Sequence, residues 1–490
     1  MVFSSQLFLF YFLPLALALY YGVRLGPRWL SHGTLTALSY LFYGWANPPF
    51  MLLMLASTAI DFACGLAIAR SGARGRAPGA EPPICEVGGP RTRVQKTALI
   101  LSICSNLLLL GFFKYFNFSL ESYNAVVEAL GLSHLAWRDF LRVTLPLGIS
   151  FYTFQSMSYT IDVYRGHARA TRSPIDFACY VSLFPQLVAG PIIRFSEVSE
   201  QLIHRTHSVR KFARGVAMFS LGLAKKVMLA NPCGKIADAC FDAGSIGALD
   251  AWWGAVAYGF QIYFDFSGYS DMAIGLGLML GFVFPKNFDS PYRSRSITEF
   301  WQRWHISLST WLRDYLYVPI GGNRRGVRRT YLNLAIVMLL GGLWHGAALN
   351  FVVWGAIHGA WLALERALGK RSLYHRLPGP LRVALTFLIV TLAWVFFRAR
   401  DLPAALAYLS SMFGLGRAQE GADLVAGLIY QPYYAISLLA AAVVVWFGRQ
   451  SWDWTRTIRA PQIAVSLVLL WLSSGMLFAQ AHNPFIYFIF

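Results

Sequence analysis

Long stretches without a charged residue are the feature that most limits what this chain can fold into. They include Met1–Gly22, Thr97–Phe113, Tyr434–Gly448 and Gln462–Ala481. Crossing the roughly 30 Å hydrocarbon core of a bilayer takes about 20 apolar residues, and these stretches approach or reach that length. The pattern predicts an all-α, polytopic integral membrane protein of about eleven spans.

Composition and charge agree with this class. Hydrophobic residues make up 56% of the chain, the mean hydropathy is +0.49, and charged residues make up 13%. Soluble domains carry about 25% charged residues, so a soluble class is excluded. The net charge of +19 lies mainly in the gaps between apolar stretches, as it does in cytoplasmic loops. The excess therefore encodes topology and attracts anionic membrane lipids, and no nucleic-acid partner is expected.

The motifs of several other chemistries are missing. The six cysteines form no C-x-x-C and no Cys/His pattern that could hold zinc, so neither a metal site nor a disulfide framework is expected. No P-loop, G-x-G-x-x-G, G-x-S-x-G or HExxH motif is present. No cofactor is expected to be bound, and the nucleophile is expected to be the substrate itself.

The basic residues predict an orientation. Arg24 and Arg28 follow the first stretch, which we interpret as a retained helix, and a Gly/Pro/Arg-rich loop occupies 71–95. Both segments should be cytoplasmic, which places the N-terminus outside. Residues 286–329 carry nine basic residues and should also be cytoplasmic, and continued alternation brings the C-terminus outside.

Two segments are predicted not to be simple spans. The stretch 177–193 contains Pro185 and Gly190-Pro191 between basic flanks, which favours a re-entrant hairpin. From Phe300 to Tyr315 the apolar residues recur on one face opposite Arg303 and Arg313, which predicts a continuous helix lying in the membrane interface.

Ionisable residues in apolar stretches are candidates for function because burying them in a membrane is costly. The candidates are Asp61, Asp162, Asp265, Asp271, His305, His345 and His358.

His345 is the strongest candidate on local grounds. It follows Gly341-Gly342-Leu343-Trp344 and precedes Gly346, in an apolar hairpin from Tyr331 to Leu364. These 34 residues fall short of the roughly 40 that two spans need, so the hairpin should bend below the surface. The glycines allow the imidazole to project into a cavity, where a neutral histidine can act as a general base. A buried histidine that only bonds a carbonyl is the structural alternative.

The other candidates also have structural interpretations. His305 falls in the predicted interfacial helix, where it can be an ordinary interfacial residue. Asp265 and Asp271 can pair with arginines, or can cap helices at a break marked by Ser267-Gly268. His358 has no evident partner, which favours simple packing. A solute transporter would also explain intramembrane carboxylates and broken helices.

Four blocks of sequence resemble the membrane-bound O-acyltransferase family, and in particular its bacterial branch of alginate O-acetylation and teichoic acid D-alanylation proteins. The blocks, in the order of the family, are Pro185–Ile192, Asp265–Asp271, Glu299–Leu308 and Gly342–Gly346. The resemblance implies one membrane-embedded domain over 1–490 with a motif-bearing catalytic core at 146–365. It also implies re-entrant and interfacial helices around a tunnel. His345 and His305 would be its catalytic residues, and the residues contacting substrate or lining the tunnel would be Trp344, Trp304, Arg303, Asp265, Ser267, Asp271 and Gln186.

The resemblance also implies a reaction. A cytoplasmic donor, expected to be acetyl-CoA, would supply acetyl groups that cross the bacterial inner membrane to a polysaccharide acceptor, with alginate as the first expectation. An extracytoplasmic partner of the SGNH serine-esterase type would take part. Transfer of D-alanyl or long-chain acyl groups to another glycan, a lipid or a protein is the alternative within the family.

Overall fold

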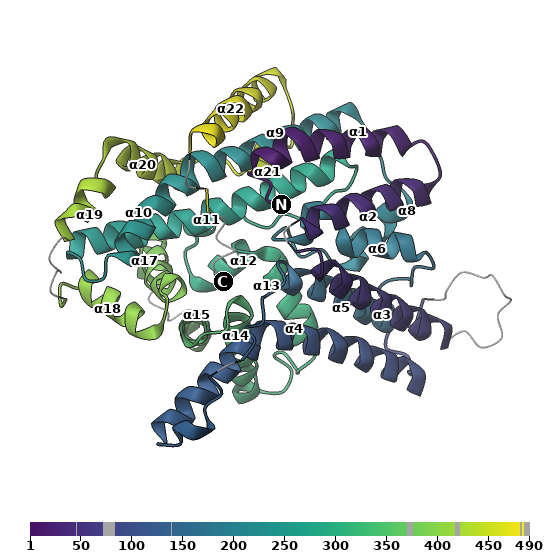
Figure 1. Cartoon of the computed structure of the whole chain (residues 1–490), viewed down its shortest axis with the longest axis horizontal. Helices are drawn as coiled ribbons and strands as arrows, with labels where there is room; N and C mark the ends of the chain where they lie inside the picture. The colour runs from purple at the N-terminus through teal and green to yellow at the C-terminus, as the bar shows by residue number, and fades with distance from the viewer. Residues whose placement is uncertain are drawn as a thin grey trace. The chain divides into compact units, whose positions relative to one another are not determined.

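The computed structural model describes residues 1–45, 47–71, 84–138, 140–369, 376–416, 422–480 and 483–484 (Figure 1). The described chain is helical and contains no strand. It divides into two compact units, which are described separately. The first unit comprises Met1–Ser208 with Leu280–Phe284, and the second comprises Val209–Met279 with Pro285–Phe490.

The first unit is built from apolar helices that pack around α3 and α5. Its helices are a π-helical turn η1 (Phe8–Phe12), α1 (Leu13–Val23), α2 (Arg28–Gly44), α3 (Phe50–Ser71), α4 (Arg93–Ala129), η2 (Ser133–Leu135), α5 (Ile149–Arg165), α6 (Pro174–Ser182), α7 (Phe184–Leu187) and α8 (Phe195–Ile203). Helix α4 begins with a capping box in which Thr92 and Gln95 bond each other's backbone N–H groups. Its 37 residues extend about 55 Å, well beyond the expected span of 97–113.

The predicted re-entrant stretch 177–193 is irregular and buried within the first unit. It contains the end of α6, the single turn α7 and an extended segment leading to α8. Pro185 lies in the first turn of α7, where its missing N–H has no helical partner to lose. Backbone of this kind is tolerated at membrane depth only inside protein or beside water, and here protein surrounds it.

The second unit carries the remaining helices. They are α9 (Val209–Ala224), the π-helical turn η3 (Lys225–Ala230), α10 (Asn231–Asp242), α11 (Ala248–Met279), η4 (Pro291–Arg293), α12 (Ile297–Arg303), α13 (Ile306–Leu312), η5 (Arg313–Tyr317), α14 (Val327–His345), α15 (Leu349–Leu368), α17 (Gly379–Arg398), α18 (Leu402–Met412), α19 (Ala422–Ile429), α20 (Pro432–Phe447), α21 (Ser451–Trp454) and α22 (Ala460–Ala479). Helix α11 lies along α9 at the centre of the unit, and α22 packs on the other side of α9 (Figure 1).

The expected break at Ser267-Gly268 is wrong, because α11 continues through it without interruption. Gly268 serves helix packing instead. A Cβ on Gly268 would lie 2.7 Å from the carbonyl oxygen of Gly222 on α9, and a Cβ on Gly222 would lie 2.5 Å from that of Gly268. The small residue lets the two backbones approach each other, so the sequence signal for a turn was a signal for close contact.

The expected continuous interfacial helix from Phe300 to Tyr315 is also wrong. The chain leaves the helical conformation at Trp304 and His305, between α12 and α13, and His305 has a left-handed φ of +43°. Trp304 and His305 are 2% and 0% exposed, so this turn is buried within the protein. The apolar periodicity was correct for each short helix, but it could not reveal the turn between them.

The hairpin around His345 is longer than its apolar stretch. Helices α14 and α15 contain 19 and 20 residues, because each continues past the apolar limit into a turn with charged side chains. Each helix is about 30 Å long, so the hairpin is longer than its apolar residues alone predict. The two helices do pack closely, and a Cβ on Gly342 would lie 2.3 Å from the carbonyl oxygen of Phe351.

Four described helices are long and apolar enough to cross a membrane: α3, α4, α17 and α22. Of the predicted loop 71–95, residues 72–83 lie outside the described residues. At its end, Arg91 donates to the carbonyl oxygens of Glu86, Gly89 and Tyr164, which ties the loop to α5.

Candidate functional site

His305 is held by the side chain of Asn287. Its Nδ1 lies 3.2 Å from Asn287 Oδ1, which also accepts from the Ser307 hydroxyl at 2.9 Å and from the Ser307 backbone N–H at 3.2 Å. A backbone N–H can only donate, so the accepting atom must be the amide oxygen. His305 Nδ1 therefore carries the proton, and Nε2 carries the lone pair.

The lone pair of His305 is buried. Nε2 has no hydrogen-bond partner among the described residues, and the ring is fully covered. Phe266 meets the ring edge-on at 4.6 Å between centroids, and Trp344 lies at 6.2 Å. Burial lowers the pKa of His305 from 6.5 to about 3, so the imidazole is uncharged at neutral pH. A buried, oriented acceptor of this kind suits hydrogen bonding to a substrate O–H or N–H group.

His345 is the last residue of α14, and its ring contacts the ring of the preceding Trp344. Its ring centroid lies 4.9 Å from that of Trp344 and 5.2 Å from those of Trp354 and Phe397. Gly346 has an extended backbone, and a Cβ there would lie 2.1 Å from a ring carbon of Phe351. A side chain at this position would therefore require the Phe351 ring to move. Trp344 thus lies in contact with the rings of both candidate histidines.

The residues before His305 support this turn. Trp304 is buried and stacks on Phe300 at 5.5 Å. Arg303 forms an ion pair with Glu299 at 2.7 Å and donates to the carbonyl oxygen of Asp289 at 3.2 Å. Arg303 therefore braces the backbone near the site, and its guanidinium is engaged with protein groups.

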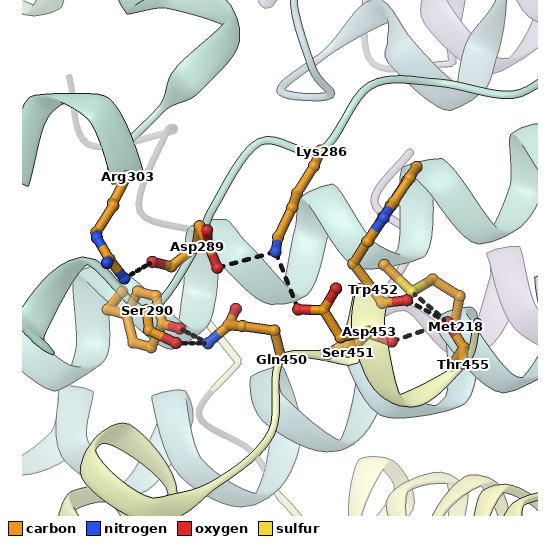
Figure 2. A network of polar contacts seen from close by, with 11 residues as sticks. Met218, Lys286, Asp289, Ser290, Arg303, Gln450, Ser451, Trp452, Asp453 and Thr455 are labelled. Atoms are coloured by element: carbon orange, nitrogen blue, oxygen red, sulfur yellow. Dashed lines mark hydrogen bonds and ion pairs between the residues drawn. The ribbon is translucent and has the colours of Figure 1, made fainter. Parts of the chain in front are cut away.

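The loop that carries Asn287 is itself anchored to α21 (Figure 2). Lys286 bridges Asp289 at 2.8 Å and Asp453 at 3.1 Å, and Gln450 donates to Ser290 at 2.7 Å. Asn287 also donates to the Ser270 hydroxyl on α11 at 2.9 Å. The acceptor for His305 is thus fixed by contacts to two other parts of the second unit.

The two carboxylates of α11 form ion pairs with lysines. Asp265 lies 2.9 Å from Lys226 Nζ, and Asp271 lies 2.7 Å from Lys225 Nζ. Both lysines belong to the π-helical turn η3. The expected arginine partners and helix caps are therefore replaced by lysine pairs. Ser267 is buried, and its hydroxyl has no hydrogen-bond partner within the described part of the chain.

The remaining sequence candidates are held by other partners. Gln186 belongs to the first unit and donates to the carbonyl oxygen of Tyr180 at 2.5 Å. Asp61 and Asp162 are in the same unit, where Asp61 accepts from Ser102 at 2.6 Å and from Asn106 at 2.8 Å. In the second unit, His358 accepts from Trp301 at 3.3 Å. No group of three His, Cys, Asp or Glu side chains that could hold a metal ion occurs among the described residues.

Several residues of this site were missed by sequence reasoning. Asn287 and Phe266 carry no chemical signal in the sequence, because an amide and a phenyl ring become important only through the fold. Lys225 and Lys226 did carry a signal. They stand within the apolar stretch 213–230, where a charged residue demands a partner.

The protein is a helical membrane protein whose second unit holds the rings of two histidines against one tryptophan ring. The sequence profile of the membrane-bound O-acyltransferase family matches residues 162–397. The chain is 46% identical to the probable alginate O-acetylase AlgI of Pseudomonas aeruginosa over 467 residues, 95% of this chain and 85% of that protein.

Two further relatives extend the comparison. The peptidoglycan O-acetyltransferase of Helicobacter pylori is 36% identical over 85% of this chain and 80% of its own length. The teichoic acid D-alanyltransferase of Streptococcus thermophilus is 31% identical over 46% of this chain and 59% of its own length. The chain belongs to the membrane-bound O-acyltransferase family. It is an acyltransferase, which sets aside the transporter alternative.

Proposed function

We propose that this protein transfers acetyl groups from cytoplasmic acetyl-CoA across the bacterial inner membrane for O-acetylation of a secreted polysaccharide, with alginate as the first candidate. The observation that carries the proposal is the contact of the His305 ring and the His345 ring with the ring of Trp344. The relative named as a probable alginate O-acetylase is more similar, and over more of the chain, than the one named for peptidoglycan.

In the proposed reaction, His345 is the general base. Its imidazole takes the proton from an acceptor hydroxyl as that oxygen bonds to the acetyl carbonyl carbon of the thioester. The carbon–sulfur bond breaks, and the proton passes to the departing thiolate of coenzyme A. His305 presents its Nε2 lone pair as a fixed hydrogen-bond acceptor that orients one of the reactants.

The acceptor hydroxyl belongs either to the polysaccharide or to a serine of an extracytoplasmic SGNH-type partner that completes the transfer. We further propose that the catalytic core lies in 146–365, that about eleven spans cross the inner membrane, and that both termini are outside. The basic segment 286–329, on the cytoplasmic side, would then meet the polyanionic donor.

Mass analysis of the secreted polysaccharide tests the proposal. Cells lacking this chain should secrete polymer without acetyl groups, and the wild-type chain should restore them. His345→Ala should fail to restore them although the protein is inserted normally, while His134→Ala, a change in an exposed turn of the first unit, should restore them. D-alanyl or longer acyl groups on the polymer, or on lipid or protein, would replace the proposal with the corresponding alternative.

A further inference from the structure

A long apolar groove runs over the surface of the second unit between α11, α17 and α20. Its volume is about 910 Å³, and its walls are formed by apolar side chains such as Val256, Val383, Phe387 and Trp446. Arg293 and Arg295 are the charged residues in its lining. His305, His345 and Trp344 are not among the residues that line this groove, so the groove is separate from the histidine site.

Both arginines lie at the same end of the groove. Arg293 donates to the carbonyl oxygens of Val445 and Gly448, where α20 ends. The guanidinium of Arg295 lies 3.9 Å from a Cβ built on Gly379, where α17 begins. The nearby carboxylate of Glu299 is already matched by its ion pair with Arg303. Arg293 is therefore fixed in place by the protein, and the exposed Arg295 beside it is the side chain that can reach an anion.

The length of the groove matches one leaflet of a bilayer. Along α17 its lining extends from Gly379 to Thr391, thirteen residues and about 18 Å of helix. This is about half of the roughly 30 Å hydrocarbon core. A groove with cations at one end and an apolar floor of one-leaflet depth has the shape and polarity of a phospholipid.

A second apolar groove also has a basic residue near the end of α20. It has a volume of about 500 Å³ and lies between η3, α20 and α22, with apolar walls that include Met228 and Leu469. Arg449, in the lining of this groove, directly follows the Gly448 carbonyl that Arg293 binds. Basic side chains thus surround the C-terminal end of α20 on both sides.

We propose that the larger groove binds one anionic glycerophospholipid, with its phosphate at Arg295 and Arg293 and an acyl chain along α17. A guanidinium binds phosphate through paired, charge-assisted hydrogen bonds, and the apolar floor shields the chain from the aqueous phase. The headgroup lies in the leaflet on the side of residues 291–296. This binding is independent of the acyl-transfer reaction.

Native mass spectrometry of the full-length protein in detergent tests this site with phosphatidylglycerol and phosphatidylcholine of identical chains. The wild type should retain phosphatidylglycerol preferentially. Arg295→Gln should lower that retention about fivefold, as expected for one basic residue at an anionic surface. Ala384→Trp, which fills the groove floor, should lower retention of both lipids. Arg400→Gln provides the matched control, since Arg400 is exposed just beyond the opposite end of α17.

Thermal unfolding without added lipid shows whether each variant is folded, and Arg295→Gln changes only an exposed side chain. Equal retention of the two lipids by the wild type would overturn the proposal, and so would unchanged retention in Arg295→Gln. An equal loss in Arg400→Gln would show general charge attraction, and an unaffected Ala384→Trp would show that no chain occupies the groove. Either result also overturns it.

Discussion

Two groups of buried polar side chains in the second unit are held in opposite ways. On α11, Asp265 and Asp271 each form an ion pair with a lysine of η3. At the α12–α13 turn, His305 is held by a neutral amide that engages only one of its nitrogens. A carboxylate in an ion pair already interacts with another group of the protein. A neutral imidazole with only one bonded nitrogen can still offer its second nitrogen to a reactant. From this difference we propose a structural role for the carboxylates and a chemical role for the histidines.

The largest expected effect comes from His345→Gln. An amide can form a hydrogen bond but cannot accept a proton at neutral pH, so activity should fall by about 10² to 10⁴. The measurement is acetyl transferred per membrane-inserted molecule. His305→Gln should lose much less, because an amide oxygen can replace a hydrogen-bond acceptor. A loss of less than about threefold in His345→Gln would return this residue to a packing role.

Breaking one of the two ion pairs should lower the stability of the folded protein. Lys226→Met removes the lysine that forms an ion pair with the buried Asp265 and should destabilise the protein by about 3–5 kcal/mol, since both side chains are almost fully covered. The double variant Lys226→Met with Asp265→Leu should recover most of this loss, measured by thermal unfolding in detergent. Loss of activity per folded molecule in that double variant would contradict the structural role and place Asp265 in the chemistry.

Asn287 bonds both His305 and Ser270 of α11, and it should control the charge of His305. Asn287→Leu removes the acceptor for Nδ1–H and should lower activity about tenfold, the equivalent of one hydrogen bond of about 1.4 kcal/mol. Asn287→Asp should instead raise the pKa of His305, because a carboxylate stabilises the imidazolium. The side chains around the ring are otherwise aromatic or uncharged: Phe266, Phe288, Trp344 and Ser307.

The pH profile distinguishes this role from simple packing. In the wild type, His305 stays neutral as the pH falls until about pH 3. In Asn287→Asp it should become protonated at a higher pH, so Nε2 loses its lone pair and activity declines earlier on the acid side. Comparing the two profiles cancels the titration of other groups. Coincident acid limbs at reduced activity would show that Asn287 only supports the fold.

The sequence predicted the membrane class, the helical fold and the family, because apolar length and four motif blocks are local properties. It placed His345 at a glycine-rich corner for the same reason. It could not predict the His305 turn, since the apolar periodicity of Phe300 and Leu308 continues across it. Nor could it identify Asn287 or Phe266, whose importance depends on contacts between distant segments. Helix ends were misplaced at α14 and α15, where charged turns continue an apolar helix.

The smallest expected effect lies outside both buried groups, on the exposed arginines between η5 and α14. Arg324 and Arg325 are solvent-exposed, so replacing both with glutamine should leave folding and the histidine site intact. If this surface attracts a polyanionic donor, the KM for acetyl-CoA should rise a few-fold at low salt, with kcat unchanged and the difference reduced as salt increases. Labelling of a Val327→Cys probe added to this double variant, from either side of the membrane, checks that orientation is preserved. An unchanged KM at low salt would leave these arginines with a purely topological role.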